Sequence, residues 1–71
     1  MSRYKLTARE CQIVALIGKG YSNEQIAEKL SLTKQTVANY NSGIYLKIDV
    51  STRAEAIIWW MDARSRSNSK N

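Results

Sequence analysis

The side chains best suited to chemistry lie in residues 33–48, which read TKQTVANYNSGIYLKI. At about 100° per residue, amide and hydroxyl side chains gather on one face of a helix in this stretch, and apolar side chains gather on the other. In the DNA major groove, the side-chain amide of Asn or Gln can form hydrogen bonds to adenine N6 and N7 at the same time. The unpaired N–H groups of a first helical turn favour anions such as phosphates. The stretch therefore carries side chains suited to reading duplex DNA.

The outward face of this helix holds the candidate contacts to DNA. Lys34 and Thr36 lie in the first turn, where contacts to phosphates are expected. Ala38 offers only apolar contact, for instance with a thymine methyl group. An ordinary solvated helix face is the alternative interpretation. The candidate DNA-binding residues are Lys34, Gln35, Thr36, Ala38, Asn39, Ser42 and Lys47.

The opposite face of the helix is apolar and is predicted to pack on a core. Its residues are Val37, Ile44 and Ile48, with Tyr40 at the margin. Thr33 can cap the start of the helix, and Asp49, which tolerates left-handed backbone geometry better than most residues, can end it. The helix is therefore expected to occupy the stretch from Thr33 to Ile48.

Two further helices are predicted ahead of it. Thr7 and Glu10 form the pattern of a capping box, and apolar residues at helical spacing follow over residues 8–19. Ser22 and Gln25 repeat that pattern before a second, shorter helix. The apolar face of this second helix comprises Ile26, Ala27 and Leu30. A short turn then leads into residues 33–48, which is the arrangement of a helix-turn-helix, whose second helix lies in the major groove.

A fourth helix, capped by Ser51, is predicted to carry two neighbouring apolar stripes. The first stripe, which can meet the core, comprises Ala54, Ile57, Ile58 and Met61. The second stripe would leave two tryptophans in water, and an exposed patch of that kind usually marks an interface. We therefore expect a homodimer joined through this helix; the alternative is one core tryptophan and one on the surface. The expected interface residues are Ala56, Ile58, Trp59, Trp60 and Ala63.

The composition agrees with a small nucleic-acid-binding domain. The chain has 71 residues, with 11 Lys and Arg against 6 Asp and Glu, and a formal net charge of +5. Such an excess favours a polyanionic partner, although it also keeps a protein soluble. The predicted helices, with no strand pattern, make the fold all-α, a four-helix helix-turn-helix domain. Residues 1–63 are expected to form the domain, and residues 64–71 a polar disordered tail.

Other classes of protein are disfavoured. The chain has no histidine, no glycine-rich phosphate loop and no carboxylate pair with an evident cleft, so we expect no enzyme, no metal site and no cofactor. No apolar run is long enough to span a membrane, and residues 1–10 lack the apolar core of a signal peptide. A cytoplasmic protein is therefore expected. Cys11, in an apolar helical pattern, is expected to be a small buried side chain.

These motifs, in this order, resemble the C-terminal DNA-binding domain of the LuxR family of transcription regulators, also called GerE-type. The matching segments are LTARE from Leu6, GKGYSNEQIAEKL ending at Leu30, Thr36-Val37, Ile44-Tyr45 with Lys47, and STRAEA from Ser51 to Ala56. The resemblance implies a four-helix domain whose third helix enters the major groove and whose fourth often forms a dimer contact. It also implies that Ala38, Asn39 and Ser42 occupy positions that commonly read bases.

The chain departs from the family pattern within the third helix. The family usually has Lys or Arg at the position of Ala38, commonly His at Tyr40, often a basic residue at Leu46 and usually glycine near Asp49. Gly43 in mid-helix costs up to about 1 kcal/mol relative to alanine. Each charge removed from a phosphate contact lowers the affinity for DNA and its salt dependence.

Two functional hypotheses follow. Because few residues precede the first predicted helix, the chain is expected to be a stand-alone regulator that binds double-stranded DNA as a homodimer. The alternative is a protein-interaction module, such as an antagonist whose fourth helix pairs with that of a full-length LuxR-type regulator. The double tryptophan and the missing cations at Ala38 and Leu46 favour this second hypothesis.

Overall fold

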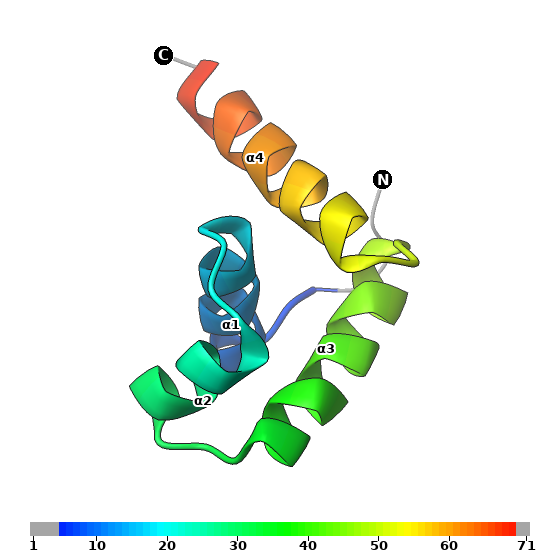
Figure 1. The fold of residues 1–71 in the computed structure, drawn as a ribbon. Helices are drawn as coiled ribbons and strands as arrows, with labels where there is room; N and C mark the ends of the chain where they lie inside the picture. Colours follow the sequence, from blue (N-terminus) through cyan, green and yellow to red (C-terminus); the bar gives the residue numbers. More distant parts are fainter. Residues whose placement is uncertain (1–4, 70–71) are drawn as a thin grey trace.

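Four helices make up the regular structure of the described chain. The computed structural model describes residues 5–69, and side chains only through residue 65; no strand occurs in this part of the chain. The helices are α1 (Ala8–Gly18), α2 (Asn23–Leu30), α3 (Lys34–Ile48) and α4 (Arg53–Ser69) (Figure 1). The predicted all-α, four-helix fold is confirmed.

The predicted caps start the first three helices. Glu10 N–H donates to Thr7 Oγ1 at 3.2 Å, and Thr7 N–H donates to Glu10 Oε1 at 2.8 Å, which completes a capping box. In the same way, Gln25 N–H donates to Ser22 Oγ at 3.1 Å, and Ser22 N–H donates to Gln25 Oε1 at 2.8 Å. Thr33 Oγ1 accepts a backbone N–H of the first turn of α3 at 3.1 Å. These bonds satisfy N–H groups that a helix cannot pair internally.

The first three helices end through residues with left-handed backbone geometry. Gly20 has a φ of +93°, Ser31 of +58° and Asp49 of +60°. At the end of α3, Val50 N–H then donates back to the Tyr45 carbonyl at 3.0 Å. The predicted end of α3 at Asp49 is confirmed. The predicted end of α1 at residue 19 is one residue too late, because the turn around Gly20 takes the chain out of the helix.

The predicted cap of α4 was wrong by one residue. Thr52, not Ser51, caps it: Glu55 N–H donates to Thr52 Oγ1 at 3.2 Å, and Ser51 contributes its backbone N–H, which donates to Glu55 Oε1 at 2.6 Å. The helix also runs past Ala63 to Ser69, through residues expected to be disordered. No glycine or proline follows Ala63, so nothing interrupts a helix that is already formed. Residues 70 and 71 lie outside the described residues.

The core lies where α1, α2, α3 and the start of α4 meet. Its buried residues are Ile13, Val14, Ile17, Ile26, Ala27, Val37, Ile44, Ile48 and Ala56. The predicted buried side of α3 is confirmed, with Tyr40 half-buried at its margin. The position of Cys11 was wrong: it is exposed, because α1 turns Ile13, Val14 and Ile17 to the core and leaves Cys11 on the side of the helix.

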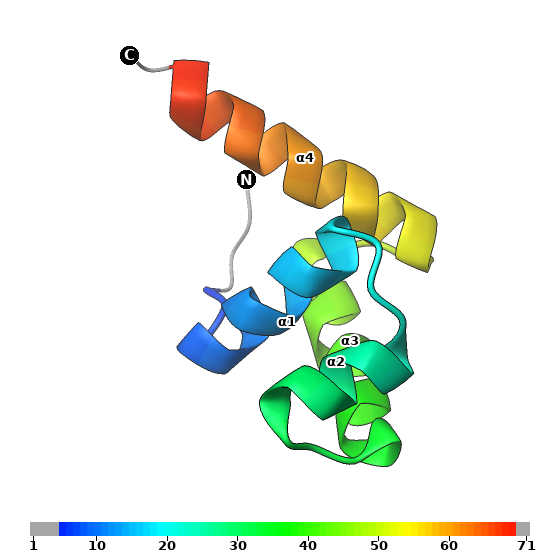
Figure 2. The ribbon, with the colours of Figure 1, turned by 60° about the vertical axis from the view of Figure 1, so that its left-hand side comes forward.

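The position of α4 on α1 depends on one close contact. α4 crosses the C-terminal end of α1 (Figure 2), and a Cβ atom built on Gly18 would overlap the indole ring of Trp60. Any residue larger than glycine at this position must displace the indole. The absence of a side chain at Gly18 therefore lets Trp60 pack against the core.

The apolar residues of α4 divide differently from the two predicted stripes, because Ile57 of the first stripe packs against the core together with the tryptophans of the second. Ala56 is fully buried, and Trp59 and Trp60 pack against the core, whereas Ile58 is 65% and Met61 60% exposed. Ala56 therefore cannot contact a second chain. Both stripes are apolar and adjacent, so periodicity alone could not tell which of them would meet α1.

Candidate nucleic-acid interface

The outward face of α3 carries the polar residues that were predicted to read bases. Gln35, Asn39 and Ser42 are exposed, and Ala38 is partly exposed beside them. Gln35 Nε2 donates to Asn39 Oδ1 at 3.1 Å, so the two amides are held together along one face. Leu46 continues this line toward the C-terminal end of α3 and is 81% exposed. The face therefore presents amide and hydroxyl groups at one end and an apolar side chain at the other.

The N-terminal turn of α3 combines a cation with helix N–H groups. The Lys34 side chain is exposed and lies 3.8 Å from a carboxylate oxygen of Glu24 on α2. The hydroxyl groups of Thr36 and Thr33 are 2.9 Å apart. The ion pair between Lys34 and Glu24 is exposed, and an exposed ion pair contributes little to the stability of the fold. Lys34 can therefore exchange Glu24 for another anion at low free-energy cost.

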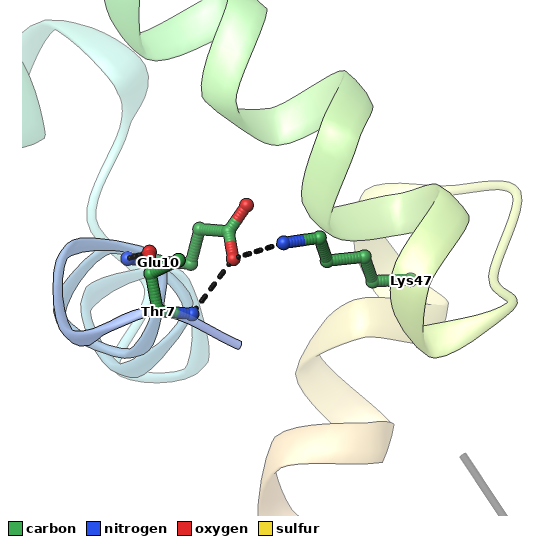
Figure 3. A network of polar contacts seen from close by, with 3 residues as sticks. All are labelled: Thr7, Glu10 and Lys47. Carbon is green, nitrogen blue, oxygen red and sulfur yellow. Dashed lines mark hydrogen bonds and ion pairs between the residues drawn. The ribbon is translucent and has the colours of Figure 1, made fainter. Parts of the chain in front are cut away.

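Lys47 does not belong to this face. Its Nζ is 2.8 Å from Glu10 Oε1, the oxygen that also accepts the N–H of Thr7 in the capping box (Figure 3). Lys47 is half-buried and Glu10 is buried. The hydrogen bond from Lys47, followed by that from Thr7 N–H, outweighs the effect of burial and holds the pKa of Glu10 below its ordinary value of 4.5. Lys47 thus ties α3 to α1.

Sequence reasoning missed Asn41, a polar residue on the buried side of α3. Asn41 is only 8% exposed, and its Nδ2 donates to Asn23 Oδ1 on α2 at 2.9 Å. The signal that could have revealed it is an amide interrupting the apolar stripe of Val37 and Ile44 at helical spacing.

The arrangement as a whole is that of a helix-turn-helix. The buried stripe of α3 packs on α1 and α2, so its opposite face is turned outward. α2 and α3 are joined by a short turn through Ser31, Leu32 and Thr33. An outward helix with a capped, cationic first turn is the geometry that places a helix in the major groove.

Comparison with known proteins agrees with this geometry. Residues 4–60 match the family model GerE, described as bacterial regulatory proteins of the luxR family. The chain belongs to the luxR family. Its members carry this helix-turn-helix as the DNA-binding domain of transcription regulators, and the resemblance inferred from the sequence is confirmed.

The relatives of this luxR-family chain include a transcriptional regulatory protein and a response regulator. It is 42% identical over 53 residues to the transcriptional regulatory protein DegU of Brevibacillus brevis, covering 75% of this chain and 22% of DegU. It is 44% identical over 54 residues to the response regulator protein VraR of Staphylococcus aureus, covering 76% of this chain and 26% of VraR. The chain thus spans about a quarter of the length of these curated relatives.

A solved structure resembles the luxR-family fold seen here. It contains the DNA-binding domain of the response regulator ComA in complex with the anti-activator RapF. The match has a TM-score of 0.74 and 37% sequence identity, and it covers 76% of this chain and 93% of the other. The four-helix arrangement is therefore that of a LuxR-type DNA-binding domain.

Two other kinds of site do not occur in the part of the luxR-family chain that the structure describes. Within residues 5–69, no helix is long and apolar enough to cross a membrane. Across the same described residues, no three His, Cys, Asp or Glu side chains gather in a group that could hold a metal ion. The outward face of α3 remains the candidate site.

Proposed function

We propose that the chain binds duplex DNA on its own, with α3 in the major groove. The observation that carries the proposal is the division of α3 into a stripe buried in the core and an outward face of exposed amide and hydroxyl groups. Gln35, Asn39 and Ser42 bond base edges, and Ala38 makes apolar contact with them. Lys34 and Thr36, in the first turn, contact phosphates.

The proposal changes the role expected of Lys47. Because Lys47 pairs with Glu10 at 2.8 Å, we assign it to holding α3 on α1 and not to a phosphate. Lys34 is then the main cation at the start of α3, and its exposed contact to Glu24 is weak enough to give way to a phosphate. The net charge of +5 adds a general attraction for DNA.

We further propose that two chains dimerise through the exposed side of α4. Ile58 and Met61 lie on that side, one turn apart, and leave large apolar surfaces in water. They replace Ala56, Trp59 and Trp60 as the centre of the expected interface. A dimer of this kind places one α3 in each of two half-sites.

The central experiment selects bound duplexes from a random pool and then measures their affinity by fluorescence anisotropy. We expect a preferred sequence with two half-sites, bound more tightly than random duplex. The affinity for both should fall as salt is raised, because phosphate contacts release counterions. Absence of binding to every duplex at low salt would refute the proposal.

Two substitutions separate the contacts to phosphates from the contacts to bases. Lys34→Ala should weaken binding to all duplexes alike and reduce the salt slope by about one counterion. Asn39→Ala should instead change which base pairs are preferred, with a loss of about 1–3 kcal/mol on the selected duplex. Titrations of selected and random duplexes at several salt concentrations measure both effects. Equal losses on every duplex for both variants would contradict these roles.

A second candidate function is that of an antagonist that pairs with another LuxR-type regulator. The exposed apolar side of α4 and the lack of a cation at Ala38 and Leu46 favour it. The ComA DNA-binding domain is itself bound by an anti-activator protein, so a domain of this fold can be held by a partner. In this case the chain would form a mixed dimer with a full-length luxR-family regulator and lower that regulator's affinity for DNA. A stable homodimer that leaves the regulator's DNA binding unchanged would exclude this role.

A further inference from the structure

The contact between α2 and α3 contains a polar pair in otherwise apolar surroundings. Asn41 lies on the buried stripe of α3, between Val37 and Ile44, both of which are fully buried. Its Nδ2 donates to the side-chain Oδ1 of Asn23, the first residue of α2, at 2.9 Å. Its own Oδ1 is buried and has no hydrogen-bond partner among the described residues.

This arrangement is a poor way to gain stability. A buried carbonyl oxygen that accepts from no protein group gains nothing from the protein for the hydrogen bonds to water that burial disrupts. Leucine at Asn41 would have the same number and branching of side-chain heavy atoms, a better helix propensity and no unsatisfied polar atom. The stability of the domain therefore does not explain an amide at this position.

The amide does supply direction. The apolar residues of the same contact, such as Ile26 and Val37, attract one another without a strong preference for angle. A hydrogen bond weakens steeply when its angle or length departs from the ideal. The bond from Asn41 to Asn23 therefore favours one orientation of α3 on α2 over others that bury the same apolar area. Polar pairs buried in helix contacts fix register in this way in coiled coils.

We propose that Asn41 is a positioning residue that sets the orientation of α3 relative to α2 through its hydrogen bond to Asn23. In this proposal Asn41 contacts no base. It acts by setting the direction in which the exposed side chains of Gln35 and Asn39 point from the outward face of α3. This inference rests on the proposed function for its effect on DNA, but its effect on the angle between the helices is a property of the free protein.

The first test compares Asn41→Leu with the wild type in the absence of DNA. Residual dipolar couplings of backbone amides report the orientation of α3 relative to α2. We expect Asn41→Leu to raise Tm by about 2–6 °C while the couplings of α3 change or average to smaller values. Unchanged couplings, or a lowered Tm, would overturn the proposal, whether or not the chain binds DNA.

The second test uses DNA. The ratio of affinities for the selected duplex and for a duplex changed at one base pair should fall about threefold or more in Asn41→Leu. A variant with the wild-type ratio overturns the inference while leaving the proposed function in place. A wild type that binds no duplex refutes the proposed function, and the couplings then decide the inference alone.

Two variants of Asn23, the hydrogen-bond partner of Asn41, test the same bond without changing a buried residue of the core. Asn23→Asp retains an oxygen that can accept from Asn41 Nδ2, and a carboxylate is favourable in the first turn of α2. Asn23→Leu removes the acceptor at a position that is only partly buried. The couplings of Asn23→Asp should match those of the wild type, and those of Asn23→Leu should match those of Asn41→Leu. If Asn23→Asp changes the couplings, or if Asn23→Leu leaves them as in the wild type, the hydrogen bond does not set the orientation of α3.

Discussion

At the scale of single residues, Glu10 serves two parts of the fold with one carboxylate. Its Oε1 accepts a hydrogen bond from Thr7 N–H, which completes the cap of α1. The same oxygen accepts a hydrogen bond from Lys47 Nζ in the last turn of α3. Both donors stabilise the ionised form of Glu10, so its pKa is lower in the folded than in the unfolded chain. The start of the first helix and the end of the third are therefore coupled through one charge.

This coupling predicts a pH dependence of stability. A carboxylate with a lowered folded pKa stabilises the fold above its unfolded pKa, near 4.5, and this contribution is lost as the pH falls through the folded pKa. Glu10→Gln should keep the cap, as Gln25 does in α2, but lose the charge. Urea unfolding should show the variant less stable at neutral pH, with the difference shrinking on acidification. A difference that stayed constant with pH would contradict this account.

Gly43 permits a second prediction at this scale. A Cβ atom built on Gly43 meets nothing within 4 Å. Gly43→Ala should therefore raise the free energy of unfolding by up to about 1 kcal/mol, or Tm by about 4–8 °C, because alanine restricts the unfolded chain and favours the helix. Thermal unfolding followed by circular dichroism measures the change. Gly18→Ala is the contrasting control: it should lower Tm, because its Cβ would overlap Trp60.

At the scale of helices, the start of α4 shows how adjacent hydroxyl residues take different roles. The Thr52 side chain accepts the N–H of Glu55, whereas Ser51 contributes its backbone N–H, which alanine retains. Thr52→Ala should cost about 1 kcal/mol of stability. Ser51→Ala should change it by less than about 0.5 kcal/mol. Chemical denaturation of the two variants tests this, and equal losses would mean that the cap is shared.

The helices differ in how far the sequence predicts them. The limits and buried side of α3 follow from local information: a cap at Thr33, a residue at Asp49 that accepts left-handed geometry, and a regular apolar stripe. The partner of Lys47 does not, because Glu10 lies 37 residues away and meets it only when α1 and α3 pack. The partner of Asn41 does not either, since Asn23 lies on another helix, although the amide itself stands out in the apolar stripe of α3.

Some features of the candidate site also follow from local sequence information, and others depend on how the helices pack. The exposure of Gln35, Asn39 and Ser42 could be predicted because it is the complement of the buried stripe. Which stripe of α4 faces outward could not, because it depends on the space that Gly18 leaves for Trp60. The contacts that any of these residues make with DNA remain predictions.

At the scale of the whole molecule, the exposed side of α4 predicts an assembly. Ile58→Asp should convert the dimer into a monomer of about 8.1 kDa, because a buried unpaired charge opposes association. Its stability should change little, since Ile58 is already 65% exposed in the single chain. Analytical ultracentrifugation measures the mass. Trp60→Ala is the matched comparison and should instead destabilise the fold. A wild type that is monomeric at high micromolar concentration would refute the interface.

The packing of Trp60 over Gly18 also gives the protein an internal spectroscopic probe. Its two tryptophans, Trp59 and Trp60, are neighbours on α4, and both pack against the core. Because Trp60 packs over Gly18, the emission of the protein should report the packing of α4 on α1, whereas circular dichroism reports the helix content. No tryptophan lies on α3, so the fluorescence of the protein can follow this packing during the DNA titrations that test the proposed function.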